Sequence, residues 1–257
     1  MKYNKRFYQI STLSISGNSL VDQSYIEQSF DEEVIFKENN FYINQSLDNV
    51  YVRSKFEAEK LVLQYITKGL NGYICRVGNL MNRFNDGKFQ SNVDENAYIG
   101  RLISLSKVGC IPDYMLNADM EFTPIDCCAE AIIKLLQYPT DNNRIFHLYN
   151  NNHVDIEDFI KALQKYRAID IVSNEEFLNK IDNLLTRKDF SNILSGILRD
   201  LDKNKKLVYE SKVKVDAQFT NEYLSQIGFR WPKIDNKYLG KFIDYFYSIG
   251  YITKEEK

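Results

Sequence analysis

The chain has 257 residues, which is enough for one large domain or two small ones with a real hydrophobic core. Its 33 Lys and Arg residues nearly balance its 35 Asp and Glu residues, so charge favours neither nucleic acid nor a membrane surface as a partner. The apolar runs are too short for a membrane span, the N-terminus lacks a signal-peptide pattern, and the four cysteines lack metal-ligand spacing, so we expect a cytoplasmic protein without a metal site.

The first predicted element is a β-strand from Phe7 to Gly17, rich in aromatic and β-branched residues. Hydroxyl side chains gather near its carboxyl end: Ser11, Thr12, Ser14 and Ser16. Ligands of open parallel α/β sheets bind at the carboxyl ends of strands, so these hydroxyls are candidates for a site; a strand with a polar face is the alternative. Residues 18–47 are mostly polar, and we expect a long loop with little regular structure that serves a binding site.

A helix is predicted from about residue 48 to Lys68. Tyr51 and Lys55 are four residues apart in it, so their side chains lie on one face. A phenol is a weak acid–base catalyst at neutral pH, and an adjacent positive charge favours its ionised form. The pair therefore indicates a proton-transfer site; two surface residues on an amphipathic helix are the alternative.

The segment 72–79 predicts a strand and the turn that follows it. With the preceding strand and helix it forms a βαβ unit, for which a right-handed crossover is expected. Further on, the sequence predicts a helix over 97–108, a helix with Asp126 as its N-cap, and a strand over 144–149.

The pattern changes near residue 150. One short strand is predicted at 212–216, and helices are predicted over 155–165, 175–185, 190–201, 222–227 (capped by Thr220) and 238–249. We therefore expect an α/β protein with two domains: residues 1–150 as a partial Rossmann-like domain with the Tyr-x-x-x-Lys motif, and residues 151–257 as a mostly helical substrate and carrier-protein domain.

Four motifs follow one another in a characteristic order: Ile10-Ser-Thr-Leu-Ser, Tyr51-Val-Arg-Ser-Lys-Phe-Glu-Ala-Glu, Cys75-Arg-Val-Gly-Asn-Leu-Met-Asn-Arg and Thr123-Pro-Ile-Asp-Cys-Cys-Ala-Glu-Ala. This order resembles the extended short-chain dehydrogenase/reductases. More closely, it resembles the terminal thioester reductase domains of nonribosomal peptide synthetases and of carboxylic acid and α-aminoadipate reductases. The resemblance covers essentially the whole chain and implies the C-terminal part of a Rossmann-like parallel sheet, followed by a mostly helical C-terminal substrate domain.

By this resemblance, the catalytic residues are Thr12, Tyr51 and Lys55. Thr12 matches the residue that hydrogen-bonds the substrate carbonyl, and Tyr51 matches the proton donor. Lys55 matches the residue that activates this tyrosine and holds the nicotinamide ribose, so Tyr51 and Lys55 are also cofactor-binding residues.

The turn after the next strand completes the implied site. Val77, Gly78 and Asn79 match the loop that lies against the nicotinamide. Many relatives have Pro at the position of Val77, and because backbone atoms make this contact, the difference matters little. Ser14 and Asn79 are expected to contact the substrate.

The implied function is NAD(P)H-dependent reductive release of a peptidyl or aminoacyl thioester from a phosphopantetheinyl carrier protein, with NADPH as the expected cofactor and an aldehyde or alcohol as product. A nucleotide-sugar epimerase or dehydratase of the same superfamily is the alternative among enzymes. A non-catalytic remnant that docks a carrier protein is the alternative outside them.

One departure from the family pattern stands out. The family begins with a strand, a G-x-x-G-x-x-G turn and a helix whose N-terminus binds the cofactor pyrophosphate, and the 11 glycines of this chain form no such motif. We therefore expect a separate N-terminal Rossmann half as a partner, and no turnover by this chain alone. Its first strand would then present an apolar edge, from which we expect a homodimer.

Overall fold

The computed structural model describes residues 5–17, 34–116, 118–186, 194, 197–198, 201–202, 204–207 and 213–253. The first half of the expected loop at 18–47 and most of the helix expected at 190–201 lie outside these residues. The chain forms two compact units. The first, which we call the sheet unit, comprises Met1–Leu80, Asp126–Asn151 and Ser211–Pro232, and the second, the helical unit, comprises Met81–Ile125, Asn152–Glu210 and Lys233–Lys257.

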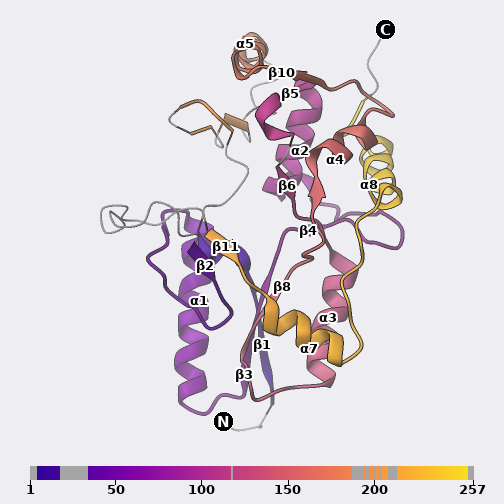
Figure 1. Cartoon of the computed structure of the whole chain (residues 1–257). Coiled ribbons are helices and arrows are strands. Elements are labelled where there is room, and N and C mark those ends of the chain that lie inside the picture. The colour runs from indigo at the N-terminus through magenta and orange to yellow at the C-terminus, as the bar shows by residue number, and fades with distance from the viewer. Residues whose placement is uncertain are drawn as a thin grey trace. The chain divides into compact units, whose positions relative to one another are not determined.

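The sheet unit is built on three parallel strands in the order β1-β3-β8 (Figure 1). Their bounds are Phe7–Thr12, Gly72–Val77 and Ile145–Leu148. The chain passes from β1 through the helix α1 (Val50–Thr67) into β3, which confirms the predicted strand–helix–strand unit. Every residue of the central strand β3 is buried, as expected for a strand covered on both faces.

Helices cover both faces of this sheet. Val62 of α1 packs against Ile74 and Ile145 on one face. On the other face, alternate β3 residues such as Tyr73 meet α3 (Ile125–Gln137) and α7 (Gln218–Gln226). Figure 1 shows these two helices beside the sheet. The alternation follows from the two-residue period of a strand.

A second strand pair belongs to the same unit. The strand β2 (Val34–Phe36) pairs in parallel with β11 (Val213–Val215). Within the long loop expected over 18–47, residues 34–36 thus form one short strand. The pairing partner lies far along the chain, so no local pattern could reveal it.

Two predicted helix caps are wrong. The helix α3 begins at Ile125, so Asp126 lies inside its first turn, where its carboxylate accepts the Cys127 amide. The helix α7 begins at Gln218, so Thr220 lies within it and is fully buried. Asp155 lies at the N-cap position of the helix α4 (Ile156–Leu163), but its side chain makes no capping hydrogen bond.

The helical unit holds the remaining elements. Its helices are α2 (Ala97–Val108), α4 (Ile156–Leu163), α5 (Asn174–Leu185) and α8 (Asn236–Ser248), with the single turns η2 (Val93–Glu95) and η3 (Asp113–Met115). Its strands are short: β5 (Cys110–Pro112), β6 (Asp119–Met120), β7 (Thr123–Pro124), β9 (Val154–Asp155) and β10 (Asp170–Val172). The strand β4 (Leu80–Met81) begins at the last residue of the first segment of the sheet unit.

The core of the helical unit is aromatic. Phe122 contacts Phe159, Tyr238 and Phe242 with ring centroids 5.5–6.2 Å apart. The helices α4 and α8 pack together across this cluster. This unit therefore has a hydrophobic core of its own.

The observed units differ from the single boundary predicted near residue 150. Residues 81–125 join the helical unit, although they precede that boundary. The segment with β11 and α7 joins the sheet unit, although it follows the boundary, because β11 pairs with β2 and α7 covers the sheet. Each unit is therefore assembled from segments distant in sequence. In the part of the chain described here, no helix is long and apolar enough to cross a membrane.

Candidate active site

The carboxyl end of β1 leads into the single turn η1 (Leu13–Ser16), and Thr12 lies at the junction. The Thr12 hydroxyl caps this turn: it accepts the Ser14 amide and donates to the Ser14 hydroxyl, each over 3.1 Å. Thr12 is buried and Ser14 is exposed. The turn ends at Gly17, where φ is +70° and an added Cβ would lie 2.8 Å from Cβ of Gln45, so only glycine fits.

The helix α1 begins next to the expected proton donor. Asn49 is its N-cap, and the Asn49 Oδ1 accepts hydrogen bonds from the amides of Tyr51 (2.9 Å) and Val52 (3.2 Å). The Tyr51 side chain is 55% exposed, and Lys55 is half-buried. The Lys55 Nζ lies 5.8 Å from the centroid of the Tyr51 ring. The ammonium and the phenol thus share one face of the helix, as their spacing predicts.

The turn after β3 lies at the same edge of the sheet as Thr12. Thr12 is the Cα partner of Val77 in the β1–β3 register. Beyond Val77, the Gly78 amide donates to the Leu148 carbonyl at the end of β8 (3.0 Å). Gly78 and Asn79 are partly exposed, so this turn is both anchored and accessible.

The helix α1 runs antiparallel to the strands, which brings its first turn to this edge. It packs against β1, β3 and η1. At the opposite edge of the sheet, where α1 ends and β1 begins, the Phe7 amide donates a hydrogen bond to the carbonyl of Asn71. Asn71 directly precedes β3. Thr12, Tyr51 and the turn after β3 therefore all lie at the carboxyl edge. Among the hydrogen bonds of the described residues, none joins Thr12 to Tyr51.

A buried ionic network beneath this edge was missed by the sequence analysis. Glu59 of α1 and Arg76 of β3 are both fully buried and form a salt bridge. The Arg76 Nη2 lies 2.8 Å from Glu59 Oε2, and Arg76 Nε lies 3.1–3.2 Å from both carboxylate oxygens. The guanidinium also stacks 4.8 Å from the ring centroid of Phe36. Such a fork holds both partners in a defined orientation.

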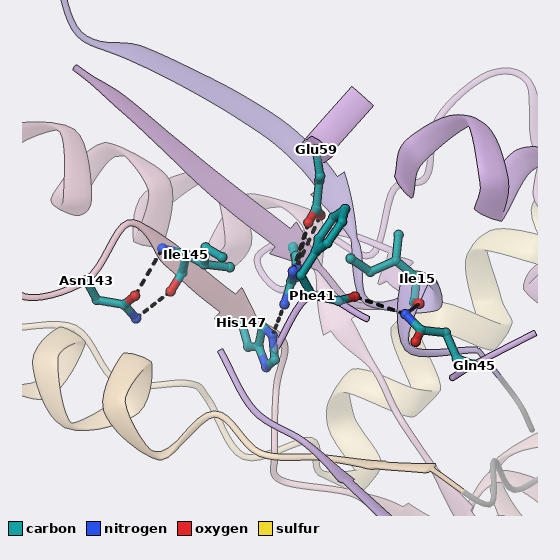
Figure 2. Close-up of polar contacts among 8 residues, drawn as sticks. Ile15, Phe41, Gln45, Glu59, Asn143, Ile145 and His147 are labelled. Carbon is teal, nitrogen blue, oxygen red and sulfur yellow. Dashed lines mark hydrogen bonds and ion pairs between the residues drawn. The ribbon is translucent and has the colours of Figure 1, made fainter. Parts of the chain in front are cut away.

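His147 extends the network to β8. Its Nε2 lies 3.1 Å from Arg76 Nη1, and its Nδ1 lies 2.6 Å from the Asp216 carbonyl; Figure 2 shows Glu59 and His147 in this network. A carbonyl can only accept, so Nδ1 carries the proton and Nε2 accepts from Arg76. Burial, and then the charge of Arg76, lowers the pKa of His147 from 6.5 to about 3. The imidazole is therefore neutral at physiological pH, as this bonding pattern requires.

Gln45 fastens the segment that precedes α1. Its Nε2 donates to the carbonyls of Ile15 (2.9 Å) and Phe41 (3.1 Å), which Figure 2 shows. Nearby, the Phe41 ring stacks on Phe56 of α1 with centroids 4.2 Å apart. These contacts tie η1 and the start of α1 together.

One sequence signal could have revealed the buried network. Glu59 lies at helical spacing between the apolar residues Phe56 and Val62, and Arg76 and His147 each interrupt an otherwise apolar strand. Ionisable side chains are rarely buried without a partner, so three such residues on neighbouring elements indicate a shared site. Which of them pair is decided only by the fold.

Comparison with known proteins finds a family model that matches the first half of the chain and several similar proteins. Residues 1–132 match the model of the NAD-binding family described as male sterility protein. Over 229 residues the chain is 25% identical to a linear gramicidin synthase polypeptide of Brevibacillus parabrevis, covering 88% of this chain and 4% of that protein.

Two solved structures are similar over nearly the whole chain. One is a thiolation-reductase di-domain of an archaeal non-ribosomal peptide synthetase, with 32% identity and a TM-score of 0.79 over 96% of this chain. The other is the reductase domain of the aureusimine biosynthetic cluster, with 27% identity and a TM-score of 0.77. This chain spans 50% of the first structure's chain and 61% of the second's.

Proposed function

The chain belongs to the NAD-binding family described as male sterility protein, and from this we propose that it carries the catalytic edge of a thioester reductase. The substrate in this proposal is a peptidyl or aminoacyl thioester on the phosphopantetheine arm of a carrier protein. The product is an aldehyde, or an alcohol after a second reduction.

The observation that carries the proposal is the pairing of Tyr51 with Lys55 at the start of α1. The phenol is accessible, the ammonium lies beside it, and α1 packs against the strands whose carboxyl ends lie at this edge. An accessible proton donor beside a fixed positive charge suits reduction of a carbonyl, because negative charge develops on the oxygen.

In the proposed reaction, Thr12 and Tyr51 hydrogen-bond the thioester oxygen. To do so, the Thr12 hydroxyl rotates from its bond with Ser14. Hydride adds to the carbonyl carbon, Tyr51 gives its proton to the oxyanion, and a hemithioacetal results. Cleavage of its C–S bond releases the aldehyde and the carrier thiol.

The residues present fit the nicotinamide end of a cofactor. Tyr51 and Lys55 offer hydrogen-bond donors for the ribose hydroxyls on one face of α1. The turn at Val77, Gly78 and Asn79, which is anchored at the end of β3, offers backbone atoms for the nicotinamide. A bound NADPH would supply the hydride. No Gly-rich pyrophosphate turn occurs in the sequence, so we propose that this part of the cofactor site comes from outside these 257 residues.

We further propose that the mostly helical segments after residue 150 form the contact with the carrier protein, and that Ser14 and Asn79 contact the bound acyl group. Ser14 is exposed, and Asn79 is partly exposed, at the proposed edge.

The test is NADPH consumption by the full-length natural protein with an aminoacyl thioester loaded on its carrier protein. We expect consumption that stops when the thioester is replaced by the free acid, because the free acid has no thiol leaving group. Titration of NADPH into the 257-residue chain alone then separates two cases. Binding supports a cofactor site within the chain, and no binding supports a site completed from outside.

A full-length protein that binds carrier protein but never consumes NADPH would contradict the proposal. That result would favour the non-catalytic docking function instead.

A further inference from the structure

The buried network of Glu59, Arg76 and His147 lies directly under the proposed catalytic edge. Glu59 is one helical turn beyond Lys55, which is itself one turn beyond Tyr51. Residues four apart form one ridge along a helix, so the proposed catalytic pair and the buried carboxylate belong to the same ridge. On the strand side, Arg76 immediately precedes Val77, where the proposed nicotinamide turn begins.

The bonds between Glu59 and Arg76 are directional in a way that the apolar contacts of α1 are not. Val62 contacts Ile74 and Ile145 through methyl groups, and such contacts tolerate small rotations or shifts. The Arg76 Nη2 and Nε atoms lie 2.8–3.2 Å from the Glu59 carboxylate, and this planar fork fits one orientation of the helix on the strand.

The other side of the guanidinium is equally constrained. His147 accepts from Arg76 Nη1 over 3.1 Å and is itself held by the Asp216 carbonyl. The His147 amide donates to the Thr220 hydroxyl over 3.0 Å. Arg76 is thus held between α1 on one side and β8 with α7 on the other.

Stability alone does not explain such a network. Replacing a buried ion pair by apolar side chains of similar volume is often neutral or stabilising, because desolvation of two charges offsets their attraction. We therefore expect the directional bonds of the Glu59, Arg76 and His147 network to influence the position of α1 more than the stability of the fold.

We propose that Glu59 and Arg76 are positioning residues that set the register of α1 against β3, and so the place of Tyr51 and Lys55 relative to the turn at Val77, Gly78 and Asn79. This inference rests on the proposed reductase function. His147 completes the device by fixing the outer face of the guanidinium.

The main test is the double variant Glu59→Leu/Arg76→Met in the full-length natural protein. It removes both charges together, so no unpaired charge is left in the core. We expect a thermal midpoint close to that of the unmodified protein and a kcat lower by on the order of 10- to 100-fold, because small misplacement of catalytic groups is costly. The KM for NADPH should rise by a smaller factor, because Tyr51 and Lys55 also hold the nicotinamide ribose in the proposed site.

The matched control is Glu57→Gln on the same helix. Glu57 pairs with Lys60 over 3.5 Å, and both side chains are more than half exposed. This variant removes an ionic contact from α1 without touching the network, and we expect unchanged kcat. A folded double variant with the kcat of the unmodified protein would overturn the inference.

A second variant serves if the double variant does not fold. Glu59→Asp keeps the charge but withdraws the carboxylate by one methylene, so a positioning role predicts a lower kcat and a smaller change in the KM for NADPH. Glu57→Asp is its control. Equal kcat in the two aspartate variants would also overturn the inference.

Amide hydrogen exchange gives a readout that does not depend on turnover. We expect faster exchange at the Gly78 amide and in the first half of α1 in the double variant, and no change in α3. Failure of the proposed function would appear instead as absence of turnover in the unmodified protein. Unchanged exchange in the double variant would refute the positioning role by itself.

Discussion

At the scale of single residues, the proposed chemistry depends on one phenol. Tyr51→Phe removes the proton donor and almost no volume, so we expect turnover of the full-length protein to fall about 10²- to 10⁴-fold while carrier-protein affinity stays the same. Steady-state NADPH consumption and a carrier-binding titration measure the two effects. The matched control is Tyr65→Phe, which removes another exposed hydroxyl from the far end of α1. Unmodified turnover in Tyr51→Phe would exclude Tyr51 as the acid.

A second residue-scale prediction concerns His147 and pH. Its pKa is about 3 in the folded chain against an ordinary value of 6.5, so the unfolded chain binds more protons between these values. The free energy of unfolding should therefore fall as the pH decreases through this window, by up to about 1.4 kcal/mol per pH unit from this group.

Urea unfolding across this pH range measures the effect. His147→Gln keeps a hydrogen-bonding side chain that does not titrate, so its stability should depend less on pH than that of the unmodified chain. His153→Gln, at the half-exposed second histidine, controls for the loss of a histidine as such. Identical pH slopes for the unmodified chain and His147→Gln would show that burial of this imidazole is not linked to stability.

At the scale of elements, α1 depends on its N-cap. Asn49 accepts two amides of the first turn, so Asn49→Ala leaves them without this acceptor. We expect the substitution to lower the free energy of unfolding by about 1 kcal/mol, measured by urea denaturation. Asn49→Asp retains an oxygen that can accept these bonds, so its free energy of unfolding should stay close to that of the unmodified chain. Equal stability of the alanine and aspartate variants would mean that the cap does not hold the helix start.

In α1, the contacts that bury the helix differ from the contacts that fix its position. Its apolar residues attach α1 to the sheet, whereas Asn49, Gln45 and Glu59 determine where it begins and how it is oriented. A helix that carries a catalytic pair needs both, because hydrophobic contacts alone do not define a register.

At the scale of the whole molecule, the open edge of β1 predicts self-association. Among the described strands, only β3 pairs with β1, and Phe7 and Ile10 on β1 are each 42% exposed. An exposed apolar strand edge recruits other strands. We expect the 257-residue chain to form a dimer in sedimentation experiments at micromolar concentration.

Ile10→Lys places a charge on this edge and should shift the chain toward the monomer. Ile133→Lys introduces the same charge at an exposed position on α3 and should leave the association unchanged. A monomeric unmodified chain would contradict the prediction.

The sequence by itself determined the strand–helix–strand unit and the shared face of Tyr51 and Lys55. These features depend on spacing within one element or between neighbouring elements, and the period of a helix or strand is a local property. The order of four short motifs also identified the family. The roles of Thr12, Val77 and Asn79 remain predictions, because the structure places them at one edge of the sheet and does not test what they bind.

The tertiary structure alone decided which distant groups meet. Arg76 bonds to Glu59, which is 17 residues away in the sequence, and to His147, which is 71 residues away. The strand β2 pairs with β11, which lies near the other end of the chain. The local sequence around Thr220 resembles a helix cap, yet the Thr220 hydroxyl accepts a hydrogen bond from the buried amide of His147. Buried polar groups must find partners wherever the packed chain provides them, and this requirement has no local signature in the sequence.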